Sequence, residues 1–162
     1  MKLRTSLLLL VILFVGATLC FASDLNLGTW KLNEAKSKID AGLPKNLTVK
    51  YEAVGDSVKG TVDGVDGKGN PTHSEWTGKF DGKDYPVTGD PTSDTRSLKK
   101  IDDHTLELTS KKGGKVTLTG KVVVAPDGKS RTLTISGTDA VEVCGRRRNG
   151  LFLREIMIHK LK

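Results

Sequence analysis

The sequence predicts an all-β domain, most simply a single antiparallel β-barrel of about eight strands. Three observations support this fold class. Apolar and polar residues alternate with a period of two, turn-forming residues separate the alternating segments, and no segment of helical length has an amphipathic 3.6-residue period. A two-sheet β-sandwich has the same sequence signature and is the alternative.

The expected strands are segments in which every second side chain is apolar. In the clearest of them, Leu47, Val49 and Tyr51 alternate with Thr48 and Lys50. Successive side chains of a strand point to opposite faces, so one face of this strand is apolar and the other is polar. The same alternation recurs at residues 58–62, 74–80, 106–108, 116–124 and 133–135.

The chain contains 18 glycines, and many of them stand with Asp or Asn between the alternating segments, as in 64–70, 81–83 and 126–128, while 113–114 is a Gly-Gly pair. Glycine, Asp and Asn tolerate the positive φ that tight hairpins require. Short hairpins join consecutive strands in antiparallel order, and closing such a sheet into a barrel removes its exposed edges. The one local helical candidate is 33–38, where Asn33 could cap a single turn.

The N-terminus has the three parts of a secretory signal peptide. Lys2 and Arg4 precede the apolar run 7–15, and small residues follow it. We expect residues 1–22 to be cleaved after Ala22, which makes the protein secreted or periplasmic. The apolar run is shorter than the about 20 residues that span a bilayer, so no stable membrane span is expected after cleavage.

Two other outcomes for the N-terminus are weaker alternatives. Cys20 could be acylated as in a lipoprotein, but the preceding Leu19 is large where that processing usually calls for a small residue. The segment could also stay as an uncleaved anchor, which its length disfavours.

The net charge of +7 is concentrated at the two ends of the chain. Without the two basic residues of the N-terminus, and without the six basic and one acidic residues after position 145, residues 23–145 hold 18 basic and 18 acidic side chains. A balanced body lacks the broad positive field that phosphate binding requires, so no nucleic-acid partner is expected.

The segment 27–33, Leu-Gly-Thr-Trp-Lys-Leu-Asn, resembles the Gly-x-Trp signature on the first strand of lipocalins and fatty-acid-binding proteins. Together with 62–66 and 77–89 it is similar to a group of small exported lipocalin-like bacterial proteins, over about residues 28–139. The resemblance implies a barrel formed by residues 23–140, with Gly28 and Trp30 as its structural signature. It also implies that Trp30 packs across the closed end, where its N–H needs a partner.

Residues 141–162 form an atypical basic C-terminal tail that departs from this resemblance. Asn149-Gly150 is a good two-residue hairpin turn, so Leu151–His159 could form a closing strand. The dense apolar content of the same residues would also suit a short helix.

No catalytic, metal or cofactor site follows from residue spacing, so we do not expect an enzyme. His73, His104 and His159 are far apart and lack paired ligand spacing. Cys144 is the one cysteine left after signal cleavage, and no orienting base or triad accompanies it. We interpret it as a free or dimer-forming thiol, and the oligomeric state stays open.

Two functions are therefore expected, in order of preference. The first is a binding module that holds a small, mostly apolar ligand, lined by Tyr51, Trp76 and Phe80 on the inward faces of their strands. The second is a structural or interaction protein of the cell envelope with a filled barrel. In that case the loop from Asp81 to Pro91, with the aromatic Tyr85, contacts a partner.

Overall fold

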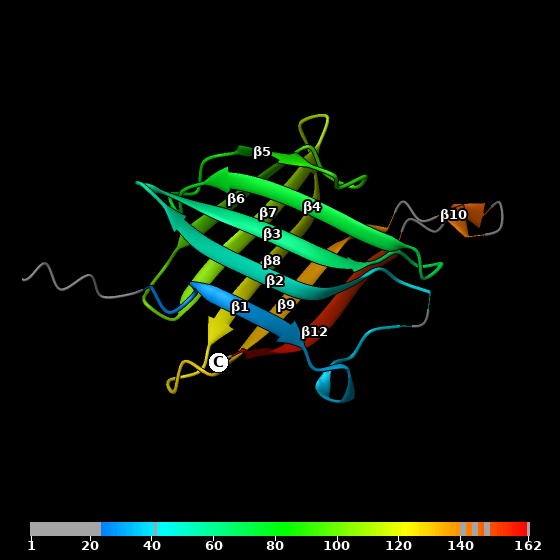
Figure 1. The fold of residues 1–162 in the computed structure, drawn as a ribbon. Helices are drawn as coiled ribbons and strands as arrows, with labels where there is room; N and C mark the ends of the chain where they lie inside the picture. Colours follow the sequence, from blue (N-terminus) through cyan, green and yellow to red (C-terminus); the bar gives the residue numbers. More distant parts are fainter. Residues whose placement is uncertain (1–23, 41, 140–141, 144–145, 148–149, 162) are drawn as a thin grey trace, which may run out of the picture.

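Ten antiparallel strands close into one barrel in the computed structural model, which describes residues 24–40, 42–139, 142–143, 146–147 and 150–161 (Figure 1). The order around the barrel is β1-β12-β9-β8-β7-β6-β5-β4-β3-β2, with β2 paired to β1. The strands are β1 (Gly28–Leu32), β2 (Lys45–Val54), β3 (Ser57–Val65), β4 (Pro71–Gly78), β5 (Tyr85–Thr88), β6 (Thr95–Lys100), β7 (Thr105–Lys112), β8 (Lys115–Val124), β9 (Ser130–Asp139) and β12 (Gly150–Lys160).

The all-β prediction and the choice of a barrel over a sandwich are confirmed, but the strand number is ten rather than about eight. The sequence reading missed β5 and β6. β5 has only four residues and contains Pro86, and it lies inside the segment expected to be a loop, Asp81–Pro91. It pairs at two positions with β4 and two with β6, and this short strand is what completes that side of the barrel.

The C-terminal segment closes the barrel. β12 pairs with β9 from Gly150↔Asp139 to His159↔Ser130, and with β1 at three positions. The closing strand is therefore observed and the short helix is wrong. The barrel extends past residue 140, where its end was expected. A separate two-stranded sheet consists of β10 (Glu142–Val143) and β11 (Arg146–Arg147). Residues 1–22, which are expected to form a signal peptide, and Cys144 lie outside the described residues.

A single 3-10 turn, η1 (Glu34–Lys36), follows β1, as expected for 33–38. The Asn33 side chain accepts a hydrogen bond from the backbone N–H of Lys36 and so caps the turn.

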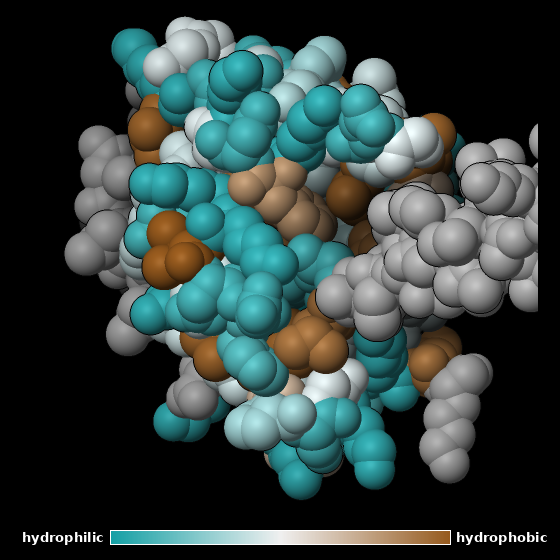
Figure 2. All heavy atoms as spheres, turned by 90° about the vertical axis from the view of Figure 1, so that its left-hand side faces the viewer, coloured by the Kyte–Doolittle hydropathy of each residue, from teal (hydrophilic) through white to brown (hydrophobic). Residues whose placement is uncertain are grey.

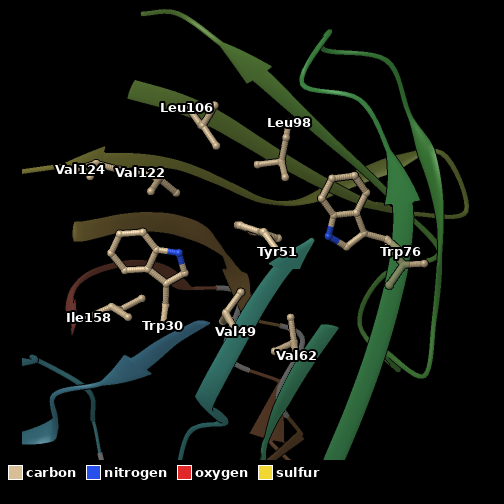
Figure 3. Close-up of a cluster of buried hydrophobic side chains, with 11 residues drawn as sticks. Trp30, Val49, Tyr51, Val62, Trp76, Leu98, Leu106, Val122, Val124 and Ile158 are labelled. Atoms are coloured by element: carbon tan, nitrogen blue, oxygen red, sulfur yellow. The ribbon is translucent and has the colours of Figure 1, made fainter. Parts of the chain in front are cut away.

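The hydrophobic core lies inside the barrel, where alternate residues of each strand meet (Figure 3). Its buried members are Trp30, Val49, Tyr51, Val62, Trp76, Val87, Leu98, Leu106, Val122, Val124 and Ile158.

Candidate ligand-binding site

The three aromatic residues predicted to line a binding site come together in the barrel interior. Tyr51 is on β2, Trp76 is on β4, and Phe80 follows β4. The ring centroid of Tyr51 lies 6.1 Å from that of Trp76 and 6.1 Å from that of Phe80, both edge-on, and the Trp76 and Phe80 centroids are 6.4 Å apart. These distances fall within the range of favourable aromatic pairs, so the three side chains form one apolar cluster.

Glycines on the barrel wall make room for this cluster. Gly60 pairs with Trp76 across β3 and β4, and a Cβ at position 60 would overlap the Trp76 indole. In the same way, a Cβ at position 78 would overlap the ring of Tyr85. The large rings therefore lie against the wall of the barrel where the backbone carries no side chain.

Trp30 lies at a different place in the interior and is fully buried. Its indole N–H donates a hydrogen bond of 2.8 Å to the backbone carbonyl of Asn26, in the segment that precedes β1. Gly28 begins β1 with φ of +111°, a conformation that favours glycine. The Trp30 N–H therefore has the hydrogen-bond partner that its burial requires, and this partner is a backbone carbonyl just before β1.

The sequence reading missed Arg131, the one charged side chain among the buried residues of the described chain. Arg131 is on β9 and only 3% exposed. Its guanidinium carbon lies 4.5 Å from the Trp30 ring centroid and 5.2 Å from that of Tyr51. Two aromatic faces therefore border a cation inside the barrel, and Tyr51 contacts both this cation and the aromatic cluster.

Within the described part of the chain, no carboxylate pairs with Arg131, and its Nε and Nη1 atoms have no hydrogen-bond acceptor. Burial lowers the pKa of Arg131 below its usual range, while Tyr51 acts in the opposite direction. A guanidinium stays protonated in proteins, so a positive charge stands in the interior. Burying an ion costs several kcal/mol, and a desolvated cation–π contact returns only about 2 kcal/mol.

Trp76, like Arg131, has a buried hydrogen-bond donor without an acceptor. The side chain is only 3% exposed, and its indole N–H has no acceptor among the described residues. Figure 3 shows Tyr51 between the two tryptophans, with the indoles of Trp30 and Trp76 on either side of it. The fourth unpartnered buried atom is an acceptor, Oδ1 of Asn26.

A second arginine, Arg96, has its hydrogen-bond acceptors within the chain. Arg96 on β6 donates from Nη2 to Oδ2 of Asp90 at 3.1 Å and from Nε to the Ser110 hydroxyl at 3.3 Å. Burial raises the pKa of Asp90, but hydrogen bonds from Ser93 and Thr92 and the charge of Arg96 outweigh it and hold that pKa below its usual range. This ion pair fastens the segment between β5 and β6.

Each of the three histidines contacts a different partner. His73 is exposed and lies 2.7 Å from Asp63, His104 lies 3.1 Å from the Val124 carbonyl, and His159 lies 2.8 Å from Asn33. The described residues contain no group of three or more His, Cys, Asp or Glu side chains that could hold a metal ion. Nor does the described chain include a helix long and apolar enough to cross a membrane.

One end of the barrel exposes apolar atoms. Figure 2 views the side that is on the left in Figure 1, and hydrophobic atoms show there between mostly hydrophilic side chains.

No protein-family model matches the chain, and no curated protein is similar to it in sequence. The assignment of function therefore depends on the geometry of the barrel interior.

Proposed function

We propose that this protein is an exported, lipocalin-like binding protein whose barrel holds a small, mostly apolar ligand. The observation that carries the proposal is the meeting of Tyr51, Trp76 and Phe80 in the interior of a closed barrel, together with the unpartnered N–H of Trp76. Binding sites for small molecules are mostly apolar and contain a few polar groups that orient the ligand. An aromatic cluster with an unused donor has this composition.

Export is part of the proposal, with residues 1–22 acting as a signal peptide that is cut after Ala22 and the mature chain secreted or periplasmic. Mass spectrometry of the protein recovered from outside the cytoplasm tests this point. The expected N-terminus is Ser23, and a chain that keeps residues 1–22 in the cytosol contradicts export.

Native mass spectrometry of the purified protein tests the binding function. The expected result is a co-purifying small molecule, or uptake of a hydrophobic fluorescent dye with a change in tryptophan emission. A barrel that carries no molecule and also excludes such dyes contradicts the proposal.

The second candidate is a structural or interaction protein of the cell envelope with a filled barrel. The close fit of Trp76 over Gly60 and of Tyr85 over Gly78 favours it, because these rings fill space on the inner wall. The segment 81–91 would then contact the partner, although it is more ordered than a simple loop: it contains β5, and the Tyr85 hydroxyl donates to Asp81 Oδ2 at 3.0 Å. Consistent exclusion of dyes is the result that supports this candidate.

A further inference from the structure

We propose that residues 24–27, the docked segment, protect the bond between Ala22 and Ser23 once the barrel has folded, so that signal peptidase has to cut this bond before folding is complete. This inference rests on the proposed export and adds an order to it, cleavage first and folding second. It follows from the contacts that hold the docked segment on the barrel, which ligand binding does not explain.

Hydrogen bonds within the docked segment close a tight turn. The Leu27 N–H donates to the Asp24 carbonyl at 2.9 Å, and Oδ1 of Asp24 accepts from the backbone and side-chain N–H groups of Asn26, each at 2.9 Å. An Asp side chain that accepts from the backbone two residues further on is a common turn device. The backbone at Asp24 therefore belongs to the fold, although only Ser23 separates it from the bond to be cut.

The turn is also tied to the body of the barrel. Asn26 is fully buried, and its carbonyl accepts the Trp30 indole N–H at 2.8 Å. The Leu25 carbonyl accepts from Nζ of Lys160 at 3.3 Å, and Leu25 and Leu27 pack against the hydrophobic core. Pulling the segment away strands the buried indole N–H and exposes apolar surface, so the folded barrel holds the segment in place.

An ion pair holds the first residue of the docked segment. Lys100, at the end of β6, donates from Nζ to Oδ2 of Asp24 at 3.3 Å and lies 3.0 Å from Oδ1 of Asp103. Burial raises the pKa of Asp24, but the hydrogen bonds from Asn26 and the charge of Lys100 outweigh it and hold that pKa below its usual range. The ion pair therefore ties residue 24 to the turn between β6 and β7.

A protease binds the residues on both sides of the bond in an extended conformation, so folded backbone has to open locally before it is cut. Hydrolysis consumes one water and leaves a carboxylate on Ala22 and an α-ammonium on Ser23. The second residue after this bond is Asp24, which the folded protein holds in a turn. Cleavage of the folded precursor therefore requires the docked segment to leave the barrel.

The test compares cleavage of the full-length precursor before and after folding. Precursor in urea is diluted directly into purified signal peptidase in detergent micelles, or is first refolded, with circular dichroism as the check. Mass spectrometry follows the loss of residues 1–22, and the folded precursor should be cut at least about tenfold more slowly. Equal rates overturn the inference but leave the signal peptide standing. Absence of cleavage after Ala22 in both samples overturns the proposed export and the inference with it.

Two insertions assign the protection to the docked segment. A glycine-serine linker of about six residues between Ser23 and Asp24 should bring cleavage of the folded precursor to within about threefold of the unfolded rate. The same linker between Gly113 and Gly114, in the β7–β8 turn where a Cβ meets nothing within 4 Å, is the matched control and should keep the protection. Continued protection in the first variant contradicts the inference, as does its loss in a folded control.

Asp24→Ala makes the same test without a change in chain length. It removes the acceptor for Asn26 and the ion pair with Lys100, so the ratio of folded to unfolded cleavage rates should rise at least about threefold. The control is Asp56→Ala, at an aspartate whose side chain is 95% exposed, and it should leave the ratio unchanged. An unchanged ratio in Asp24→Ala contradicts the inference.

Discussion

The two tryptophans of the barrel have nearly the same burial and opposite surroundings. Trp30 is 0% exposed and Trp76 is 3% exposed. The N–H of Trp30 is bound by the Asn26 carbonyl, whereas the N–H of Trp76 has no acceptor among the residues described. Cations border the ring of Trp30, and aromatic rings border that of Trp76.

Under the proposed function, this difference separates a stabilising tryptophan from a candidate binding residue. The hydrogen-bonding requirement of the Trp30 N–H is met within the chain, as expected for a buried indole that stabilises the fold. The indole N–H of Trp76 and two nitrogen donors of the Arg131 guanidinium have no acceptor among the described residues. Tyr51 lies between these two side chains and contacts both. Unmet donors cost stability, and the proposed binding function gives a reason for their presence at this part of the interior.

The largest expected effect comes from replacing each tryptophan with phenylalanine. Trp30→Phe strands the Asn26 carbonyl in a buried position and weakens the stacking of Arg131, whereas Trp76→Phe strands no acceptor. Trp30→Phe should therefore destabilise the protein by about 1–3 kcal/mol more than Trp76→Phe. Urea unfolding followed by circular dichroism measures both free energies. Equal losses would show that the two residues have the same role.

The next effect concerns the ion pair between Asp90 and Arg96, which fastens the chain between β5 and β6. Asp90 accepts from Thr92, Ser93 and Arg96. Replacing it in the Asp90→Asn variant removes charge-assisted hydrogen bonds and should cost about 1.5–3 kcal/mol at pH 7. Hydrogen exchange should rise in β5 and β6 more than in β1 and β2, so a uniform rise would contradict the local role.

The same carboxylate predicts a pH dependence. The folded-state pKa of Asp90 is lowered, so its contribution is fully present above the unfolded-state pKa of about 3.9 and is lost as the pH falls through the lower folded value. Between about pH 5 and pH 2 the urea midpoint of Asp90→Asn should therefore fall less steeply than that of the unaltered protein. Parallel pH profiles would show that Asp90 does not contribute in this way.

A further effect, specific to one contact, is expected at Gly60. In the Gly60→Ala variant the added methyl group meets the Trp76 indole, and such overpacking costs about 1–3 kcal/mol. Introducing the same change into a Trp76→Leu background should cost clearly less, because the smaller side chain leaves room. An equal cost in both backgrounds, measured by urea unfolding, would mean that the indole does not lie against Gly60.

The apolar half of the candidate site was predictable from the sequence. The two-residue period places Tyr51, Trp76 and Phe80 on inward faces, because side chains on one face of a strand recur at every second position. What the period cannot give is which inward residues of different strands meet. Their meeting depends on the register of β2 against β3 and of β3 against β4, which pairing across the sheet determines.

The polar half was missed for a physical reason. Arg131 stands two residues before Leu133 and four before Ile135, so it shares their inward face on β9. A search restricted to apolar residues skips it, because arginine is seldom fully buried. The signal that could have found Arg131 is a basic residue at the same two-residue spacing as the apolar residues of one strand face. β5 and β6 were missed because one is short and contains a proline and the other alternates weakly.

The smallest effect tests the two cations over Trp30 against each other. Lys160 lies 5.1 Å from the ring centroid and its ammonium donates to the Leu25 carbonyl, at a partly exposed site. Replacing it in Lys160→Met removes a cation–π contact of about 0.5–1 kcal/mol but leaves no charge buried, so the loss of unfolding free energy should be of that size. Urea unfolding measures it, and a loss as large as that of Trp30→Phe would place the stabilising charge at Lys160. A small loss would agree with a contact at a partly exposed site, because the buried contact between Trp30 and Arg131 at 4.5 Å is intact in this variant.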